Sequence, residues 1–159
     1  MRFPRLAILM LIVPVLFSCD EPEHGFCFTD ISPETGFDAP VKFELKMIDT
    51  INPQQLSVAA RLYHHKQTHN TIPVVLEAVS PSGQHGCDTL YLPIPSESTP
   101  QCRYERTNGY TTLQWTYRRN IINREYGVWN FTMYPLRSYG DRSVYRSVTG
   151  LGIYCKTDK

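Results

Sequence analysis

The sequence has little excess of either charge and no apolar run long enough to span a membrane. Lys and Arg total 16 against 15 Asp and Glu, so the formal net charge is +1. Nucleic-acid-binding domains normally carry a strong basic excess, so this balance argues against a nucleic-acid partner. The longest apolar run covers 12 residues. A membrane-spanning helix needs about 20, so the run is too short to cross a bilayer.

The sequence also lacks the local motifs of common enzyme classes. It contains no Gly-x-Ser-x-Gly, no His-Glu-x-x-His and no glycine-rich phosphate loop. The histidines His64, His65 and His69 lie close together, but no acidic residue stands among them. A solvated hairpin tip is therefore a simpler interpretation than a metal site. We expect no catalytic residue, no metal, no other cofactor and a non-enzymatic protein.

The N-terminus has the layout of an export signal. Two arginines precede the apolar run of residues 6–17, and the segment Leu16-Phe17-Ser18-Cys19 resembles a bacterial lipobox, although its phenylalanine is bulkier than usual. The resemblance predicts a lipoprotein signal peptide over residues 1–18, acylation of Cys19 and a lipidated tether over residues 19–25. The alternative is an ordinary secreted protein that is cut nearby and keeps Cys19 as a plain thiol.

Removal of the signal would leave 141 residues and, with two arginines lost, a net charge of −1. The acidic residues within 20–23 resemble the surface-export signal of Bacteroidetes lipoproteins. In enterobacteria, an aspartate directly after the lipidated cysteine resembles a signal for retention in the inner membrane. We expect a lipid-anchored protein of the outer membrane. The sequence leaves open whether it lies on the periplasmic face or on the cell-surface face of that membrane.

Four further cysteines are Cys27, Cys87, Cys102 and Cys155. An even number in an oxidising compartment suggests two disulfides, for which three connectivities exist. We favour Cys87–Cys102, which closes a local loop, and Cys27–Cys155, which ties the first strand to the last. Four unpaired, buried thiols are the alternative. No Cys-x-x-Cys spacing occurs, which argues against zinc and thioredoxin-type chemistry.

Alternation of apolar and polar residues dominates the rest of the chain. It places Val41, Phe43, Leu45 and Met47 on one face of a strand. Further strands are expected at residues 26–31, 56–62, 72–79, 88–94, 110–117, 128–134 and 148–155. Residues 93–108 are expected to form a long irregular connection. Residues 26–159 therefore predict one all-β domain, an antiparallel β-sandwich of immunoglobulin-like or jelly-roll-like type with about 7–8 strands.

Aromatic residues and arginines gather in the C-terminal half. Such residues bind sugars or polymers by stacking, and they also fill sandwich cores. Trp115 is in phase with Leu113, and Trp129 is in phase with Phe131, so we expect both tryptophans inside. The tyrosines within residues 139–145 lie near turns and are better candidates for exposure.

The layout resembles the gliding-motility lipoprotein H family of Bacteroidetes. The likeness rests on the lipobox, the segments Ser80-Pro81-Ser82-Gly83 and Asp88-Thr89-Leu90, and the closing Gly150-Leu151-Gly152-Ile153 before Lys156. Residues 127–131 fill the family's penultimate strand pattern, whereas the four mature cysteines are a departure. The resemblance implies an outer-membrane lipoprotein, without catalytic residues, that is linked to gliding machinery and to type IX secretion components.

Two segments resemble the O-glycosylation motif of exported Bacteroidetes proteins. They are Asp49-Thr50-Ile51 and Asp88-Thr89-Leu90, so Thr50 and Thr89 are candidate acceptors. The second segment is also the family's structural signature, and both interpretations remain open.

These features favour a lipid-anchored, non-enzymatic β-sandwich that acts by protein–protein contact with envelope or gliding-machinery proteins. Its N-terminal lipid would hold it at the membrane and raise its effective concentration near partners there. The alternative is a surface glycan-binding or adhesion lipoprotein that uses the Tyr and Arg residues. Exposed Tyr and Arg residues that line one concave groove would favour the glycan, and a flat apolar patch would favour a protein partner.

Overall fold

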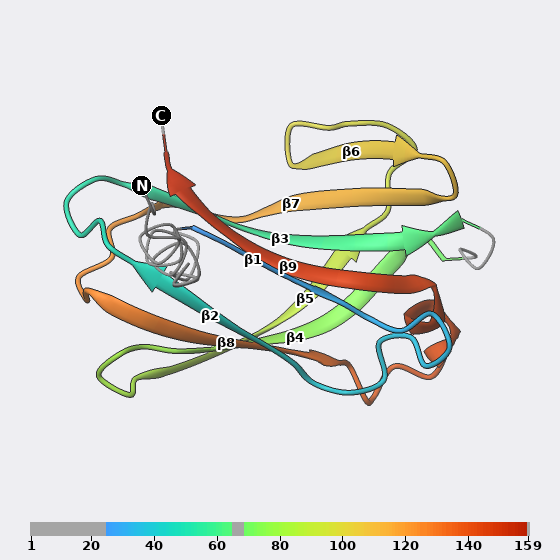
Figure 1. Ribbon diagram of the computed structural model, residues 1–159, viewed down its shortest axis with the longest axis horizontal. Coiled ribbons are helices and arrows are strands. Elements are labelled where there is room, and N and C mark those ends of the chain that lie inside the picture. The colour runs from blue at the N-terminus through green and yellow to red at the C-terminus, as the bar shows by residue number, and fades with distance from the viewer. Residues whose placement is uncertain (1–24, 65–68, 159) are drawn as a thin grey trace, which may run out of the picture.

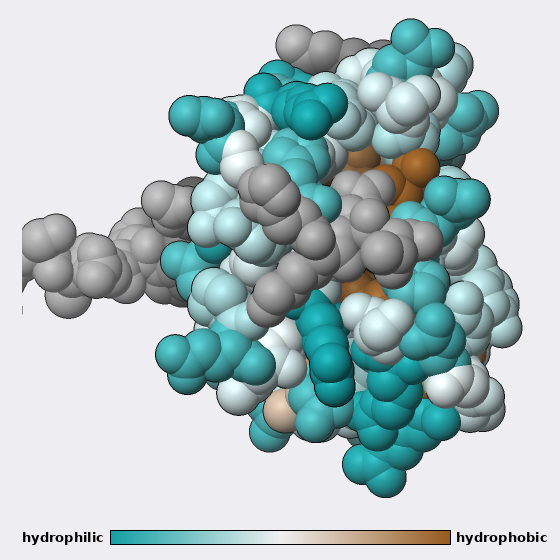
Figure 2. Space-filling view, turned by 90° about the vertical axis from the view of Figure 1, so that its right-hand side faces the viewer, coloured by the Kyte–Doolittle hydropathy of each residue, from teal (hydrophilic) through white to brown (hydrophobic). Residues whose placement is uncertain are grey.

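A computed structural model describes residues 25–64 and 69–158 of the chain (Figure 1). The predicted signal peptide, Cys19, the tether up to residue 24 and His65 lie outside the described residues. Within the described part, no helix combines the length and apolar character needed to cross a bilayer. The end of the molecule that faces the viewer in Figure 2 is mainly hydrophilic, with few brown side chains between the teal and white ones.

The described chain forms two antiparallel sheets packed face to face (Figure 1). Sheet A has the strand order β1-β9-β3-β7-β6 and sheet B the order β2-β8-β4-β5. The strands are β1 (Phe26–Asp30), β2 (Val41–Met47), β3 (Gln54–Tyr63), β4 (Thr71–Val79), β5 (His85–Pro93), β6 (Cys102–Thr107), β7 (Tyr110–Ile121), β8 (Gly127–Pro135) and β9 (Val148–Thr157), with the 3-10 helix η4 (Arg142–Ser147) before the last strand. The prediction of an antiparallel β-sandwich is confirmed.

The strand order decides between the two sandwich types. β1 pairs with β9, β2 with β8, β3 with β7 and β4 with β5, all antiparallel. This is a long hairpin of paired strands that has been rolled so that successive pairs alternate between the sheets, which is the jelly-roll arrangement. β6 is an addition to it, and it pairs with β7 at the edge of sheet A.

The core lies between the sheets and follows the alternation seen in the sequence. In β2, Phe43, Leu45 and Met47 are buried, whereas Lys42 and Glu44 are exposed. Trp115 is buried in β7, and Trp129 in β8 is half-buried against the core. Burial of these apolar surfaces is the main favourable term that holds the two sheets together.

Strand β6 lies within residues 93–108, where an irregular connection was expected. Its sequence is CRYERT, of which only Cys102 is buried. Because β6 is an edge strand, backbone pairing with β7 from Cys102–Trp115 to Thr107–Tyr110 forms it, with only Cys102 and Tyr104 packed against the core. This pairing brings the number of strands in residues 25–64 and 69–158 to nine.

The prediction that the tyrosines within residues 139–145 are exposed is wrong for Tyr145. This residue lies in η4 and is only 3% exposed. Its O–H donates to the carbonyl of Pro73 at 2.7 Å and accepts from the N–H of Leu136 at 2.9 Å. The pairing of β4 with β8 ends at Val74–Pro135, so Pro73 and Leu136, the next residues along the two strands, are not paired with each other. Proline has no N–H to continue that ladder, so the phenol supplies the hydrogen bonds that the backbone cannot.

Candidate functional site

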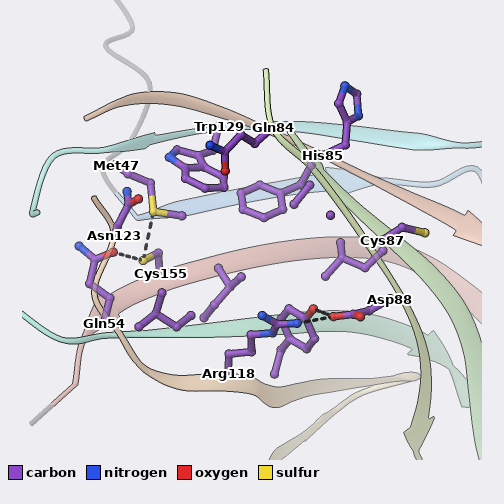
Figure 3. A pocket seen from close by; sticks show the side chains of 17 residues that line it. Met47, Gln54, Gln84, His85, Cys87, Asp88, Arg118, Asn123, Trp129 and Cys155 are labelled. Carbon is purple, nitrogen blue, oxygen red and sulfur yellow. Dashed lines mark hydrogen bonds and ion pairs between the residues drawn. The ribbon is translucent and has the colours of Figure 1, made fainter. Parts of the chain in front are cut away.

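A cavity of about 500 Å³ lies between the sheets and is lined by both (Figure 3). β6 pairs with β7 only as far as Trp115, so no strand of the described part of the chain lies on the outer side of residues 117–121 of β7. The cavity lies between this part of β7 and the first half of β5. The short edge strand thus leaves open one side of the sandwich that a longer strand would cover.

A β-bulge places two polar side chains at the cavity. Ser57 pairs with Thr116 and Leu56 pairs with Arg118, so Tyr117 is an extra residue in β7. A bulge re-aims side chains that would otherwise alternate between the faces of a sheet. Tyr117 and Arg118 consequently both line the cavity, although they are neighbours in a strand.

Both of these side chains bind Asp88 of β5. The Tyr117 O–H donates a short hydrogen bond to Asp88 Oδ2, and Arg118 Nη2 donates to the same oxygen at 2.7 Å. Figure 3 shows Arg118 and Asp88 meeting at one side of the cavity. The cluster joins the two sheets, since Asp88 belongs to sheet B and the other two residues to sheet A.

The cluster shifts the pKa of each of its members toward one charge state. Hydrogen bonds from Tyr117 and then Arg118 lower the pKa of Asp88 below its ordinary value. Burial, followed by the hydrogen bond to Asp88, raises the pKa of Tyr117 to about 12. At neutral pH the cluster is therefore a carboxylate held by a neutral phenol and a guanidinium cation.

The opposite part of the cavity is aromatic. Trp129 and Phe131 occupy alternate positions of β8 and are stacked, with ring centroids 6.4 Å apart and planes at 20°. The Trp129 Nε1–H donates to the carbonyl of Glu125 at 3.4 Å, so its polar edge is occupied. Trp129 thus presents an apolar ring to the cavity, where it lies apart from Asp88 and Arg118 in Figure 3.

Cys155 also lines the cavity and is held as a neutral thiol. Its S–H contacts Gln54 Oε1 at 3.2 Å and Met47 Sδ at 3.8 Å, as the dashed lines in Figure 3 show. Burial raises the pKa of Cys155 to about 11. A thiol with this pKa is a poor nucleophile at neutral pH, because the reactive species is the thiolate.

The structure corrects the predicted disulfides, because all four mature cysteines are free thiols. Cys87 is exposed on β5, whereas Cys102 is buried at the start of β6 in the other sheet. Cys27 pairs with Ile153 across β1 and β9, so Cys155 lies two positions further along β9 instead of directly opposite. The state observed is the alternative of unpaired thiols, but only Cys102 is buried, whereas Cys27 and Cys155 are half-buried and Cys87 is exposed.

The described histidines bind neighbouring side chains. His64 lies 3.3 Å from Thr111 Oγ1, and His69 Nε2 lies 2.7 Å from Ser143 Oγ and 3.5 Å from Asp141 Oδ2. Among the described residues, no group of three or more His, Cys, Asp or Glu side chains could hold a metal ion.

The candidate glycan acceptors differ in exposure. Thr89 is exposed on the outer face of β5, and Thr50 is half-buried in the loop after β2. Modification of either threonine stays a prediction.

The sequence patterns do not assign the cavity residues to a site. Asp88 stands out in the sequence only within the Asp-Thr-Leu segment, and Trp129 only as a core residue. The alternation of β7 assigns Tyr117 and Arg118 to opposite faces, so it gives no sign that they act together. The one available signal was the Tyr- and Arg-rich composition of the C-terminal half.

No family model matches the chain, and no curated protein matches it either. Among solved structures, the chain is similar to the CspB protease of Clostridium perfringens, with a TM-score of 0.38 and 15% sequence identity. The match covers 82% of this chain and 25% of the protease, so the chain spans about a quarter of that protein's length. A likeness at this level shows no shared activity, and the resemblance to the gliding-motility lipoprotein H family stays a prediction.

Proposed function

We propose that the chain is a lipid-anchored, non-enzymatic binding protein of the outer membrane whose cavity holds a sugar residue of a glycan. The observation that carries this proposal is the combination of an aromatic wall with a charged cluster in one cavity. One tyrosine, Tyr117, and one arginine, Arg118, line this concave site, and Tyr117 is half-buried.

The chemistry of the cavity suits a pyranose ring. Such a ring has an apolar C–H face, which stacks on an indole such as Trp129, and hydroxyl edges, which need both donors and acceptors. Asp88 offers a carboxylate acceptor and Arg118 offers guanidinium donors, and both remain partly exposed, at 40% and 59% of their side chains. The volume of about 500 Å³ falls among small-ligand sites, which typically measure about 300–1,000 Å³.

The protonation states support binding over catalysis. General acid–base catalysis is most efficient when the catalytic group has a pKa near the working pH. The pKa of Tyr117 is raised to about 12 and that of Cys155 to about 11, while that of Asp88 is lowered. Each of these groups therefore keeps one protonation state at neutral pH.

Saccharide binding can be tested by saturation-transfer NMR with the methyl glycosides of glucose, galactose, mannose, N-acetylglucosamine and glucuronic acid. We expect at least one glycoside to bind, and Trp129→Ala and Asp88→Asn each to weaken it at least tenfold. Tyr91→Ala is the matched control, since Tyr91 is 62% exposed on the outer side of β5 and does not line the cavity. No binding of any glycoside, or unchanged binding by Trp129→Ala, would contradict the proposal.

Contact with other proteins of an envelope assembly is the second candidate function. An aromatic row on the outer face of sheet A favours it. The row consists of Phe26, Phe28 and Tyr154, with the rings of Phe26 and Tyr154 4.4 Å apart. Gly150 and Gly152 leave room for the Phe28 ring, because a Cβ at either position would lie 2.6 Å from it. Aromatic residues are enriched at protein interfaces.

The second function can be tested in cells by deletion, followed by motility and secretion assays and pull-down from outer membranes. If protein contact is the function, the deletion strain loses motility or secretion, and Tyr154→Ala reduces co-purification of a partner while Trp129→Ala does not. Normal motility and secretion with no co-purifying partner would reject this candidate.

A further inference from the structure

Exposed large apolar side chains gather at one end of the sandwich. Six such residues occur among the described part of the chain, and five of them belong to the β2–β3 loop, the β7–β8 loop or the start of β8. These five, which we call the apolar end, are Ile48, Ile51, Ile122, Tyr126 and Val128. Ile51 is 82% exposed, Tyr126 64% and Ile122 58%. The sixth residue, Tyr91, lies on β5.

The strand pairing brings the two loops together. Met47 pairs with Gly127, so Ile48 follows one member of this pair and Tyr126 precedes the other. Gln54 pairs with Ile121 in the other sheet, next to Ile122. Both loops therefore close the same end of the sandwich, on the left in Figure 1.

Hydrogen bonds hold these loops in place. Asp49 Oδ1 accepts from the N–H groups of Ile51 at 3.0 Å and Asn52 at 2.9 Å. In the second loop, the Glu125 carboxylate accepts from the N–H of Ser82 at 3.0 Å. The isoleucines are consequently displayed by ordered turns that do not fold them back onto the core.

The N-terminal segment enters the domain at this same end. The Gly25 carbonyl accepts from the N–H of Cys155 at 2.7 Å, and the N–H of Asp158 donates to the carbonyl of Pro53 in the β2–β3 loop at 2.8 Å. Five residues, 20–24, separate Gly25 from Cys19, so six Cα-to-Cα steps join the two. An extended chain spans at most about 3.6 Å per step, so this connection reaches about 20 Å.

We infer that the apolar end inserts into the interfacial layer of the bilayer that holds the lipid anchor. The inference rests on the acylation of Cys19, which is part of the proposed function. The short reach keeps this end of the domain near the membrane surface, where isoleucine side chains leave water and tyrosine occupies the headgroup level. The lipid and the loops together then fix the orientation of the domain.

The insertion can be measured with the acylated protein in vesicles of phosphatidylethanolamine and phosphatidylglycerol whose acyl chains are brominated. Tryptophan is introduced in the variants Ile51→Trp and Ile122→Trp, with Tyr91→Trp as the matched control. We expect bromine to reduce the added emission of the first two at least twofold and to leave that of the control unchanged. Equal quenching of Ile51→Trp and Tyr91→Trp, or none in either, would overturn the inference. Cross-linking of two copies through the apolar end, without quenching, would also overturn it and assign this end to self-association.

The mass of the N-terminal peptide distinguishes the two proposals. Acylated Cys19 without quenching rejects the insertion and leaves the anchor and the glycan site intact. Unmodified Cys19 rejects the anchor, and with it the basis of the insertion.

Discussion

At the scale of single residues, the cavity depends on pairs that the chain order does not reveal. Asp88 and Arg118 are 30 positions apart, and they meet because β5 and β7 form facing parts of the two sheets. The pair is partly exposed, so its value for stability is small, and its main effect is to hold two polar groups at the cavity.

Replacement of Asp88 by Asn should lower stability in a pH-dependent way. The pKa of Asp88 is lowered in the folded state, so its stabilising contribution is present above the ordinary value of 3.8 and is lost as the pH falls through the folded pKa. We expect Asp88→Asn to reduce the free energy of unfolding by about 1 kcal/mol or less at pH 7, as for partly exposed ion pairs. Urea unfolding should show that the difference between the two proteins shrinks toward pH 2. A difference that grows at acid pH would contradict the assignment.

The cysteines should differ in reactivity toward N-ethylmaleimide at pH 8. Burial raises the pKa of Cys102 and Cys155 to about 11, against an ordinary value of 9.0, so each carries about one hundredth of the usual thiolate fraction. Cys87 is exposed and should be labelled first. Peptide mapping after timed labelling measures the order. An intact mass about 2 Da below that of the reduced chain would instead show a disulfide.

At the scale of elements, irregularities shape the site more than regular strands do. The bulge at Tyr117 brings two neighbours to one cavity, and Asn120, three positions later, has a φ of +53°, which asparagine tolerates better than most residues. The short β6 leaves the adjoining part of β7 uncovered. None of these features has an apolar pattern that the sequence would reveal.

The hydrogen bonds of Tyr145 that join η4 to sheet B should contribute measurably to the free energy of unfolding. Tyr145→Phe removes both the donor to the Pro73 carbonyl and the acceptor for the Leu136 N–H. Because these groups lie where the ladder ends, we expect a loss of about 1–3 kcal/mol in the free energy of unfolding. Tyr126→Phe is the control, since Tyr126 is 64% exposed, and it should change stability little. Equal effects of the two variants would show that the buried Tyr145 hydroxyl does not contribute to the free energy of unfolding.

At the scale of the whole molecule, the jelly roll places the N-terminal entry of the chain, the β2–β3 loop and the β7–β8 loop at one end of the sandwich. Residues beside both loops also line the cavity. Strands β1 and β9 are neighbours, so the first described residue lies beside the last strand. The proposed anchor is thereby joined to the domain at the end where the exposed isoleucines lie. One topology thus links the proposed membrane attachment to the orientation of the proposed sugar site.

Replacement of Cys19 by Ser should abolish membrane attachment without unfolding the domain. Acyl chains on Cys19 would give near-permanent anchoring, at about 0.8 kcal/mol for each buried CH₂ group. In cells fed labelled palmitate, we expect label in the wild type and none in Cys19→Ser, with the variant moving from the membrane to the soluble fraction. Cys87→Ser is the matched control and should keep the label. Unchanged labelling of Cys19→Ser would place the lipid elsewhere or exclude it.

The sequence by itself determined the strands whose apolar residues alternate, because burial of one face imposes a period of two on residues such as Phe43 and Leu45. It also predicted the all-β class and the export layout of the N-terminus. Only the tertiary structure decided the jelly-roll order, the edge strand β6, the free thiols, the burial of Tyr145 and the cluster of Asp88 with Tyr117 and Arg118. The physical reason is that local patterns report which face of a strand is buried. Strand partners, bulges and facing side chains depend on contacts between distant parts of the chain.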